Sequence, residues 1–399
     1  MQERLRFLEA PGPWLWIALA LGAALRVYCV GWTEGSFDVA IKQHHGTQVG
    51  RLGLMGWYRA AEVFNHPPLM GEFFAGLVTL ADASGVPFRV LLRAPFALLD
   101  FGTALLLWRL LRERPERWLV AAAYWLHPLA VIFSSYHGNT DSALACIALA
   151  SVVLASTGRS VAAGVALGVG FWIKLPIVLA APAIVFAFPH WRARVRCAVS
   201  AAIVGSVTYL PALLVDPVLV FQRIVGYPGT GVVTPGGIAV WGIAHTLRLA
   251  DTAFAAGLEA ANTAVCFLPL LAYAWWRRGR LEPCELAASV AGCFLILYGF
   301  TSFWAWQYLA WSIPFLLCRG RGFAIVSSVV LGSYVYGAYA FFTGSPWLQG
   351  RWDFASHSAW PPVLALLRDA SVLLCFGAAC GSLLWAGRDE WRRWRRATP

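Results

Sequence analysis

The sequence predicts an all-α integral membrane protein with about twelve transmembrane helices. Of the 399 residues, 59% are hydrophobic and only 13% are charged, and the mean hydropathy is +0.63. A chain of this composition consists mostly of membrane spans and leaves no room for a large soluble domain. Many of the 21 tryptophans lie near the ends of apolar runs, where an indole ring favours the lipid headgroup layer. We therefore expect a single membrane domain over residues 1–399.

The arginines predict the topology. The net charge of +11 comes from arginines in short loops between apolar runs, a pattern that orients a chain in a bilayer and excludes nucleic acid as a partner. With the N-terminus inside, every arginine cluster falls inside only if two apolar stretches do not cross the membrane. These stretches, residues 67–81 and 236–249, are therefore expected to be amphipathic or re-entrant helices on the outer face.

The crossing helices follow from the apolar runs between those clusters. The first run follows Arg4 and Arg6 and is long enough to be a retained signal anchor. The runs at residues 161–173 and 175–188 are shorter than the roughly 20 residues of a usual span. They meet at Lys174-Leu175-Pro176, which predicts a tight corner at the outer face. The spans are expected approximately at residues 14–32, 88–111, 118–135, 141–157, 161–173, 175–188, 197–215, 254–276, 284–302, 304–318, 322–342 and 363–386.

Three longer segments are expected on the outer face: residues 33–87, 216–252 and 343–362. The second contains Gly-rich and Pro-rich stretches at residues 226–231 and 234–237, which predict turns and not a phosphate loop, because no strand-to-helix context surrounds them. A mobile loop that covers a substrate and a plain connector both stay open for this segment.

No metal site or disulfide framework is expected. The nine cysteines include no Cys-x-x-Cys pair, and most lie inside apolar runs. His44 and His45 are adjacent, so on a helix they point about 100° apart and cannot easily share one metal ion.

The polar residues of the expected outer face are the candidates for chemistry. Only two lysines occur, Lys42 and Lys174, and an ammonium group there could hold a phosphate, although a lysine that snorkels from a helix end is the alternative. Asp38 follows the first span and could act as general base toward a sugar hydroxyl. A phosphate leaving group needs no paired acid, only cationic support. The alternative for Asp38 is the N-cap of a helix that begins at Val39.

Five features follow one another along residues 14–316. They are Asp38 after the first span, Pro67-Pro68-Leu69 at the end of the first outer segment, Arg93 with Asp100 in the next span, His137-Gly138-Asn139-Thr140-Asp141, and Trp306-Gln307-Tyr308-Leu309 with Trp311 and Pro314. Together these features resemble the GT-C superfamily of polytopic glycosyltransferases that use polyprenyl-phosphate sugars. The last of them is similar to the Gln-Tyr motif of the mannosyltransferases that act on glycosylphosphatidylinositol and of related bacterial enzymes.

The resemblance implies a GT-C-like fold with Asp38 as catalytic base. Asp141 has a second interpretation as the N-cap of the following span, and Arg93 with Asp100 has one as a structural polar pair. Some relatives carry paired acids in the first loop, whereas here the nearest other acid is Glu34, so metal dependence and the acceptor stay open. The candidate substrate-binding residues are Lys174, His137, Asp141, Gln307, Tyr308, Lys42 and His66.

The expected activity is an inverting transfer of mannose or another hexose from a polyprenyl-phosphate donor to a hydroxyl group, without a separate cofactor. The acceptor is a glycan, a lipid or a protein. The arginine-rich and alanine-rich composition is typical of a GC-rich prokaryotic genome, so we expect a bacterial inner-membrane protein with its active site facing the periplasm or the exterior. The alternatives are a transporter or flippase of lipid-linked sugars, with charges along a translocation path, and a subunit without catalytic activity.

Overall fold

The computed structural model describes residues 11–226, 240–247, 249, 252–302, 304–353 and 360–397. Within these residues the protein is helical, apart from a two-residue antiparallel ladder between β1 (Val240–Trp241) and β2 (Trp304–Ala305). The all-α prediction is therefore confirmed. The turn-rich stretches predicted at residues 226–231 and 234–237 lie almost entirely outside the described residues.

Several helices are suited to a membrane. Five single helices in the described residues are long and apolar enough to cross one: α2 (Pro13–Trp32), α5 (Phe88–Leu110), α17 (Pro283–Phe300), α19 (Arg321–Thr343) and α20 (Pro362–Ala397). Two bent pairs could each form one further span: α6 (Arg117–Trp125) with α7 (Pro128–Val131) and the π-helix η1 (Ile132–Tyr136), bent by 45°, and α15 (Ala253–Ala260) with α16 (Asn262–Trp276), bent by 63°. The described residues thus contain five to seven candidate spans.

The prediction of about twelve spans is not confirmed, because several apolar runs fold into short or broken helices. The run at 197–215 divides into α11 (Trp191–Val207) and α12 (Leu210–Val215), and the run at 304–318 becomes the 3₁₀-helix η4 (Trp306–Trp311) and α18 (Ile313–Leu316). The remaining apolar helices are shorter than the roughly 20 residues of a usual span. They are α8 (Asp141–Ser156), α9 (Ser160–Ile173), and η2 (Leu175–Leu179) with α10 (Ala181–Ala187).

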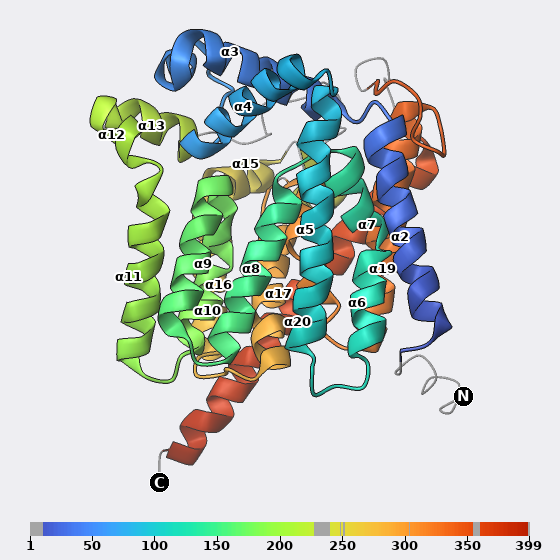
Figure 1. Ribbon diagram of the computed structural model, residues 1–399. Coiled ribbons are helices and arrows are strands. Elements are labelled where there is room, and N and C mark those ends of the chain that lie inside the picture. Colours follow the sequence, from blue (N-terminus) through green and yellow to red (C-terminus); the bar gives the residue numbers. More distant parts are fainter. Residues whose placement is uncertain are drawn as a thin grey trace.

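One end of the bundle is covered by a layer of helices: α3 (Phe37–Ala60), α4 (Pro68–Ser84), α12 and α13 (Pro217–Ile224) (Figure 1). Tyr58 and Phe64 pack in one apolar cluster with Val220 and Ile224, so the layer is joined across the chain. The helix predicted at 67–81 is therefore present, and it begins at Pro68 as expected for a proline in the first turn. The second predicted outer helix is wrong in its described part, since residues 240–247 form β1 and the four-residue α14 (Ile243–Thr246).

Glycines let two neighbouring helices approach closely. A Cβ atom on Gly164 of α9 would lie 2.1 Å from Oγ of Ser200, and one on Gly168 would lie 2.7 Å from Cβ of Val204. Small residues four apart are typical of close helix pairs in membranes. Helix α9, which Lys174 follows, also contacts α4 of the layer.

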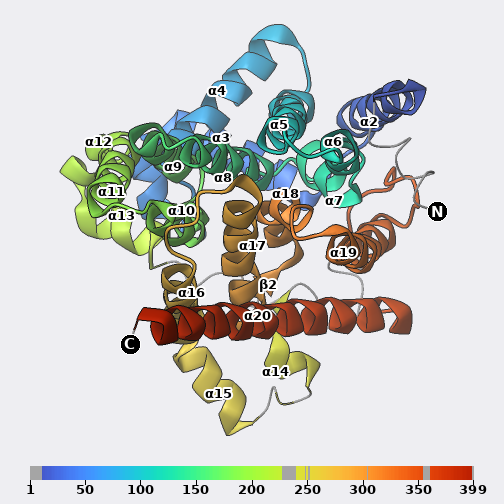
Figure 2. The same ribbon diagram turned by 90° about the horizontal axis from the view of Figure 1, so that it is seen from below.

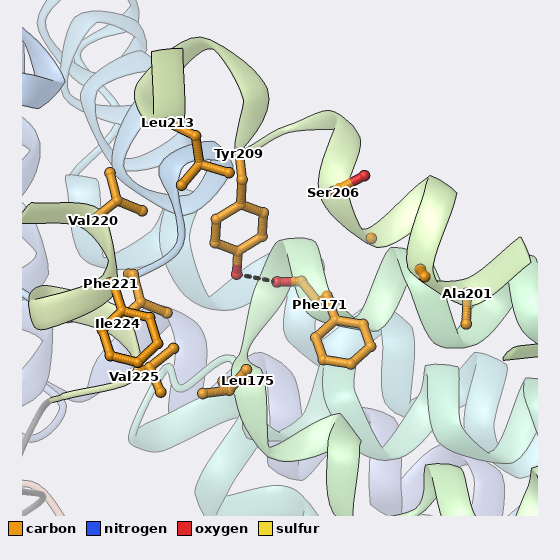
Figure 3. Close-up of a pocket in the computed structure, with 12 residues that line it drawn as sticks. Phe171, Leu175, Ala201, Ser206, Tyr209, Leu213, Val220, Phe221, Ile224 and Val225 are labelled. Atoms are coloured by element: carbon orange, nitrogen blue, oxygen red, sulfur yellow. Dashed lines mark hydrogen bonds between the residues drawn. The ribbon is translucent and has the colours of Figure 1, made fainter. Parts of the chain in front are cut away.

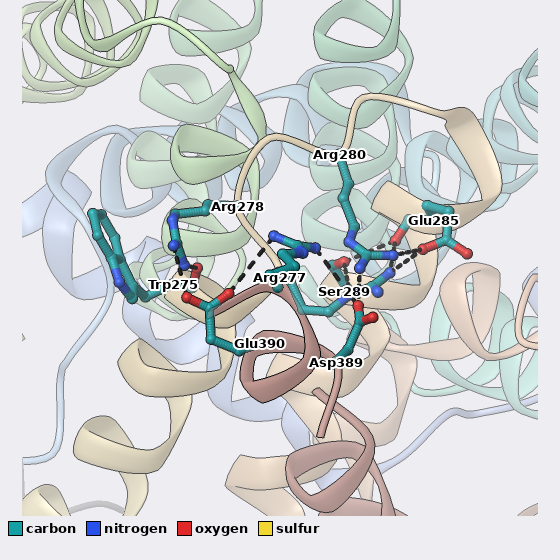
Figure 4. A network of polar contacts seen from close by, with 9 residues as sticks. Trp275, Arg277, Arg278, Arg280, Glu285, Ser289, Asp389 and Glu390 are labelled. Atoms are coloured by element: carbon teal, nitrogen blue, oxygen red, sulfur yellow. Dashed lines mark hydrogen bonds and ion pairs between the residues drawn. The ribbon is translucent and has the colours of Figure 1, made fainter. Parts of the chain in front are cut away.

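The opposite end of the bundle holds the arginine-rich loops together. Helix α2 begins there and α20 ends there (Figure 1), and α20 crosses one side of the bundle next to α16 and α17 (Figure 2). Figure 4 shows the loop between α16 and α17 bound to the last turns of α20. The ion pairs are Arg278 with Glu390, Arg280 with Asp389, and Arg277 and Arg280 with Glu285. The predicted grouping of these clusters at one side is in agreement with this arrangement.

A buried ion pair joins α2 and α5 inside the bundle. Arg26 donates to Oδ2 of Asp100 from Nε and Nη2 at 3.1 and 2.8 Å, and its guanidinium lies 3.8 Å from the Trp125 ring centre. Asp100 also accepts from Tyr124 and Ser134, at 3.0 and 2.6 Å. The predicted pair of Arg93 with Asp100 is therefore wrong, because Asp100 pairs with Arg26, whereas Arg93 binds other groups.

We predict that Asp100→Leu lowers the free energy of unfolding by about 3 kcal/mol, since it leaves the Arg26 charge buried without its partner. Thermal unfolding of the purified protein in detergent measures the loss. The double variant Arg26→Met, Asp100→Leu should recover most of the stability, because no unpaired charge is left. Asp100→Leu with wild-type stability would contradict this role.

Candidate active site

Asp38 lies in the first turn of α3, in the layer of helices that covers one end of the bundle. The helix begins at Phe37 and its N-cap position is Ser36, so the interpretation of Asp38 as the N-cap of a helix from Val39 is wrong. The partial positive charge of a helix N-terminus favours a carboxylate at this position. The side chain is 36% exposed, so a substrate can reach it.

Both polar partners of Asp38 in the described chain bind the same oxygen. Nε2 of His137 lies 3.0 Å from Oδ2, and Nζ of Lys42, one turn further along α3, lies 3.5 Å from Oδ2. The second oxygen, Oδ1, has no such contact among the described residues. The carboxylate is thus held in place by one oxygen and presents the other.

The surrounding charges keep Asp38 ionised. Burial alone would raise the pKa of this carboxyl group, but the hydrogen bond to His137 and the ammonium of Lys42 lower it well below its usual range. Lys42 is only 2% exposed, and burial lowers its pKa, an effect that Asp38 partly offsets. The two groups therefore support each other's charged forms.

A second ion pair lies beneath the first. Lys174 is the C-cap of α9, and its Nζ lies 2.6 Å from Oδ1 of Asp141. The same oxygen accepts from Nε1 of Trp311 at 2.5 Å. Asp141 is fully buried, and its Oδ2 has no hydrogen-bond partner in the described part of the chain. The N-cap interpretation of Asp141 is wrong, because Thr140 occupies that position and the carboxylate binds Lys174. The predicted corner at Lys174 is confirmed, since α9 ends at Ile173 and η2 begins at Leu175.

The two ion pairs belong to one site. Lys42 interacts electrostatically with Lys174 and Asp141, and Asp38 interacts with Lys174. The site thus combines two carboxylates with two ammonium groups, and one carboxylate oxygen of each pair is unbound. An additional anion placed between the ammonium groups would be attracted by both.

A π-helix and a glycine place His137 and Asp141 on either side of a turn. Helix η1 ends at Tyr136, and Gly138 has φ +65°, a conformation that other residues rarely adopt. A Cβ atom on Gly138 would also lie 2.8 Å from Cγ of Arg93. π-helical turns often occur at functional sites. The turn directs His137 to Asp38 and Asp141 to Lys174.

Arg93 fixes the connection that carries Asp38. From α5 its guanidinium donates to the carbonyls of Val30 and Thr33 at 3.0 and 2.8 Å, and to Oγ1 of Thr33 at 3.0 Å. The side chain is fully buried. The sequence identified Arg93 but not this role.

The other predicted site residues lie nearby. Tyr308 stacks on Trp311, with ring centres 4.5 Å apart, and Nζ of Lys174 lies 5.7 Å from each ring centre. Gln307, on the same short helix η4, is half-buried. His66 packs against Phe74 at 5.1 Å, and burial lowers its pKa well below the usual value, so it adds no positive charge at neutral pH.

Sequence reasoning missed Tyr339, whose hydroxyl lies 2.7 Å from Nδ1 of His137. Tyr339 belongs to α19 and is 202 residues from its partner. The only signal was a tyrosine in an otherwise apolar run, and neighbouring tyrosines at 334 and 336 made it indistinguishable. His44, His45 and the other possible ligands form no group of three that could hold a metal ion in the part of the chain described.

Two apolar cavities open between helices near this end. The smaller, about 280 Å³, lies between α9, α11 and α13 and includes Leu175, next to Lys174 (Figure 3). The larger, about 950 Å³, lies between the candidate spans α2 and α19, and η1 contributes Ile132, whose carbonyl accepts from the His137 backbone N–H. Tyr28 and Tyr336, one from each wall, donate to the carbonyls of Trp347 and Pro346 at 2.8 Å and hold the segment that lines this cavity.

Comparison with known protein families identifies a family whose model matches the chain. The family model of glycosyltransferase family 87 matches residues 64–300, more than half of the chain, and this range includes His66, His137, Asp141 and Lys174 but not Asp38. No curated protein matches the chain. With apolar helices suited to a bilayer and this match, the chain belongs to glycosyltransferase family 87, whose members transfer sugars, and is an integral membrane protein.

Proposed function

We propose that this glycosyltransferase is of the GT-C type and transfers a hexose, with mannose as first candidate, from a polyprenyl-phosphate donor to an acceptor hydroxyl with inversion. The observation that carries the proposal is the state of Asp38, ionised, bound by His137 and Lys42 at Oδ2 and open at Oδ1. A general base needs this free oxygen within hydrogen-bond reach of the attacking group.

The reaction follows from the positions of the charges. The acceptor O–H bond breaks, its proton goes to Oδ1 of Asp38, and the oxygen forms a bond to the anomeric carbon from the face opposite the phosphate. The bond between that carbon and the phosphate oxygen breaks, and its electron pair stays on the polyprenyl phosphate. The ammonium groups of Lys42 and Lys174 stabilise the charge that develops on this leaving group.

The aromatic and polar residues around Lys174 are suited to the sugar. Tyr308 and Trp311 form a stacked pair beside the ammonium group, and Oδ2 of Asp141 is an acceptor without a donor among the described residues. Hydroxyl groups of a hexose can donate to such an oxygen. Gln307 and His66 complete the proposed substrate contacts. The hydrocarbon chain of the donor fits the apolar cavity between α2 and α19, which both have the length of membrane spans.

Asp38→Asn should reduce transfer by about 10³-fold or more, because an amide cannot accept the proton, while folding is unaffected. The assay uses reconstituted protein, synthetic decaprenyl-phosphate mannose and decaprenyl-phosphate glucose in turn, and bacterial membranes as the acceptor source. Asp82→Asn, an exposed acid on α4, is the matched control and should retain activity. Full transfer by Asp38→Asn would refute the assignment. Movement of the donor across liposomes without bond cleavage would favour the flippase alternative.

The acceptor is a glycan, a lipid or a protein, and we place the enzyme in a bacterial inner membrane with the site and the outer segments 33–87, 216–252 and 343–362 facing the periplasm. The arginine-rich end then lies in the cytoplasm, in agreement with the usual charge bias of membrane proteins.

Cysteine labelling tests this orientation. A membrane-impermeant maleimide should label Gln43→Cys, on the exposed side of α3, in intact cells, and should label Arg388→Cys only after the cells are permeabilised. The unsubstituted protein serves as the blank. The reverse labelling pattern would place Asp38 in the cytoplasm and contradict the proposal.

A further inference from the structure

We infer that Tyr339 is a positioning residue of the site, which acts by holding the His137 imidazole so that its Nε2–H group donates to Asp38. This inference rests on the proposed function of Asp38. The contact that motivates it is the 2.7 Å separation between the Tyr339 hydroxyl and Nδ1 of His137.

The three side chains form a chain of polar contacts from three separate elements. Tyr339 comes from α19, His137 from the end of η1, and Asp38 from α3. Tyr339 is fully buried and His137 is 3% exposed, whereas Asp38 faces the accessible side. Water therefore cannot easily replace Tyr339 as the partner of Nδ1.

The hydrogen-bond chemistry of the imidazole defines the roles. An ionised carboxylate only accepts, so the contact with Asp38 requires a hydrogen on Nε2. In the neutral ring Nδ1 is then an acceptor, and a buried acceptor without a donor costs free energy. The Tyr339 hydroxyl supplies that donor. Both ring nitrogens are then satisfied in one tautomer and one ring orientation.

Packing restricts the Tyr339 hydroxyl to this direction. The ring lies edge-on to Tyr136, Trp306 and Trp352, with centre separations of 5.7, 6.1 and 5.0 Å. A ring enclosed on these sides cannot turn its hydroxyl elsewhere without displacing large buried side chains. Tyr339 thus links the orientation of Asp38 to the core between η1, η4 and α19.

Tyr339→Phe should lower kcat by about 10–100-fold with little change in KM, as is typical when a partner that orients a reactive group is removed. The phenylalanine keeps the ring packing, so thermal unfolding in detergent should show only the small loss of stability that one missing buried hydrogen bond causes. Tyr273→Phe, which removes a buried hydroxyl bound to the carbonyl of Ala288, is the matched control and should leave kcat unchanged.

A double-mutant cycle separates positioning from general support of the fold. If Tyr339 acts through His137, the loss caused by Tyr339→Phe should disappear in the His137→Ala background. Multiplicative losses in the double variant, or wild-type kcat for Tyr339→Phe, would overturn the inference while leaving the role of Asp38 intact. Full transfer by Asp38→Asn, in contrast, would refute the proposed role of Asp38 and, with it, the inferred role of Tyr339.

A measurement that needs no activity completes the test. In ¹⁵N-histidine spectra, the signals of His137, assigned by their loss in His137→Ala, should show a protonated Nε2 and a hydrogen-bonded, unprotonated Nδ1. In Tyr339→Phe, the Nδ1 signal should move to the position of an acceptor without a donor. A hydrogen on Nδ1 of the neutral ring in the wild-type protein would overturn the inference.

Discussion

The site depends on the hydrogen bonds that Arg93 donates to the connection between α2 and α3. This buried guanidinium binds two carbonyls and a hydroxyl within Val30–Thr33, and it lies 3.4 Å from the carbonyl of Tyr136 in η1. The guanidinium therefore joins the connection that precedes α3 to the π-helix that His137 follows. A buried arginine is costly unless its donors are satisfied, so these backbone carbonyls have little freedom to move apart. Asp38 and His137, 99 residues apart, meet because both of their elements are fixed to one side chain.

Charge balance explains why four ionisable groups can lie together at the end of an apolar bundle. Each ammonium has its own carboxylate, Lys42 with Asp38 and Lys174 with Asp141, so neither charge is left uncompensated. The free carboxylate oxygens and the aromatic pair of Tyr308 with Trp311 are not needed for this balance. A lipid phosphate would join the two ammonium groups and place its sugar against these remaining contacts. The arrangement that balances these charges also offers, in the proposed reaction, contacts for an anion and an acceptor for a proton.

The sequence predicted the helical class, the corner at Lys174 and the helix that begins at Pro68, because apolar runs and proline act locally. It did not predict the number of long helices, since α11 and α12 separate within one apolar run and only tertiary packing shows the break. Asp38, Lys42, His137, Asp141 and Lys174 could be nominated as polar groups in an apolar chain, and the structure brings them together. Their pairing could not be derived, as the errors over Arg93 with Asp100 and over the caps at Asp38 and Asp141 show. The contact of Tyr339 with His137 could not be predicted, because a contact between residues 202 positions apart leaves no local sequence pattern.

The most direct test of the central claim is a structure of the protein in lipid nanodiscs with decaprenyl phosphate bound. The account predicts the phosphate between Lys42 and Lys174, about 3 Å from both Nζ atoms, with Oδ1 of Asp38 facing the position of the missing sugar and the hydrocarbon chain between α2 and α19. A phosphate bound away from both lysines, with the two ion pairs unchanged, would contradict it.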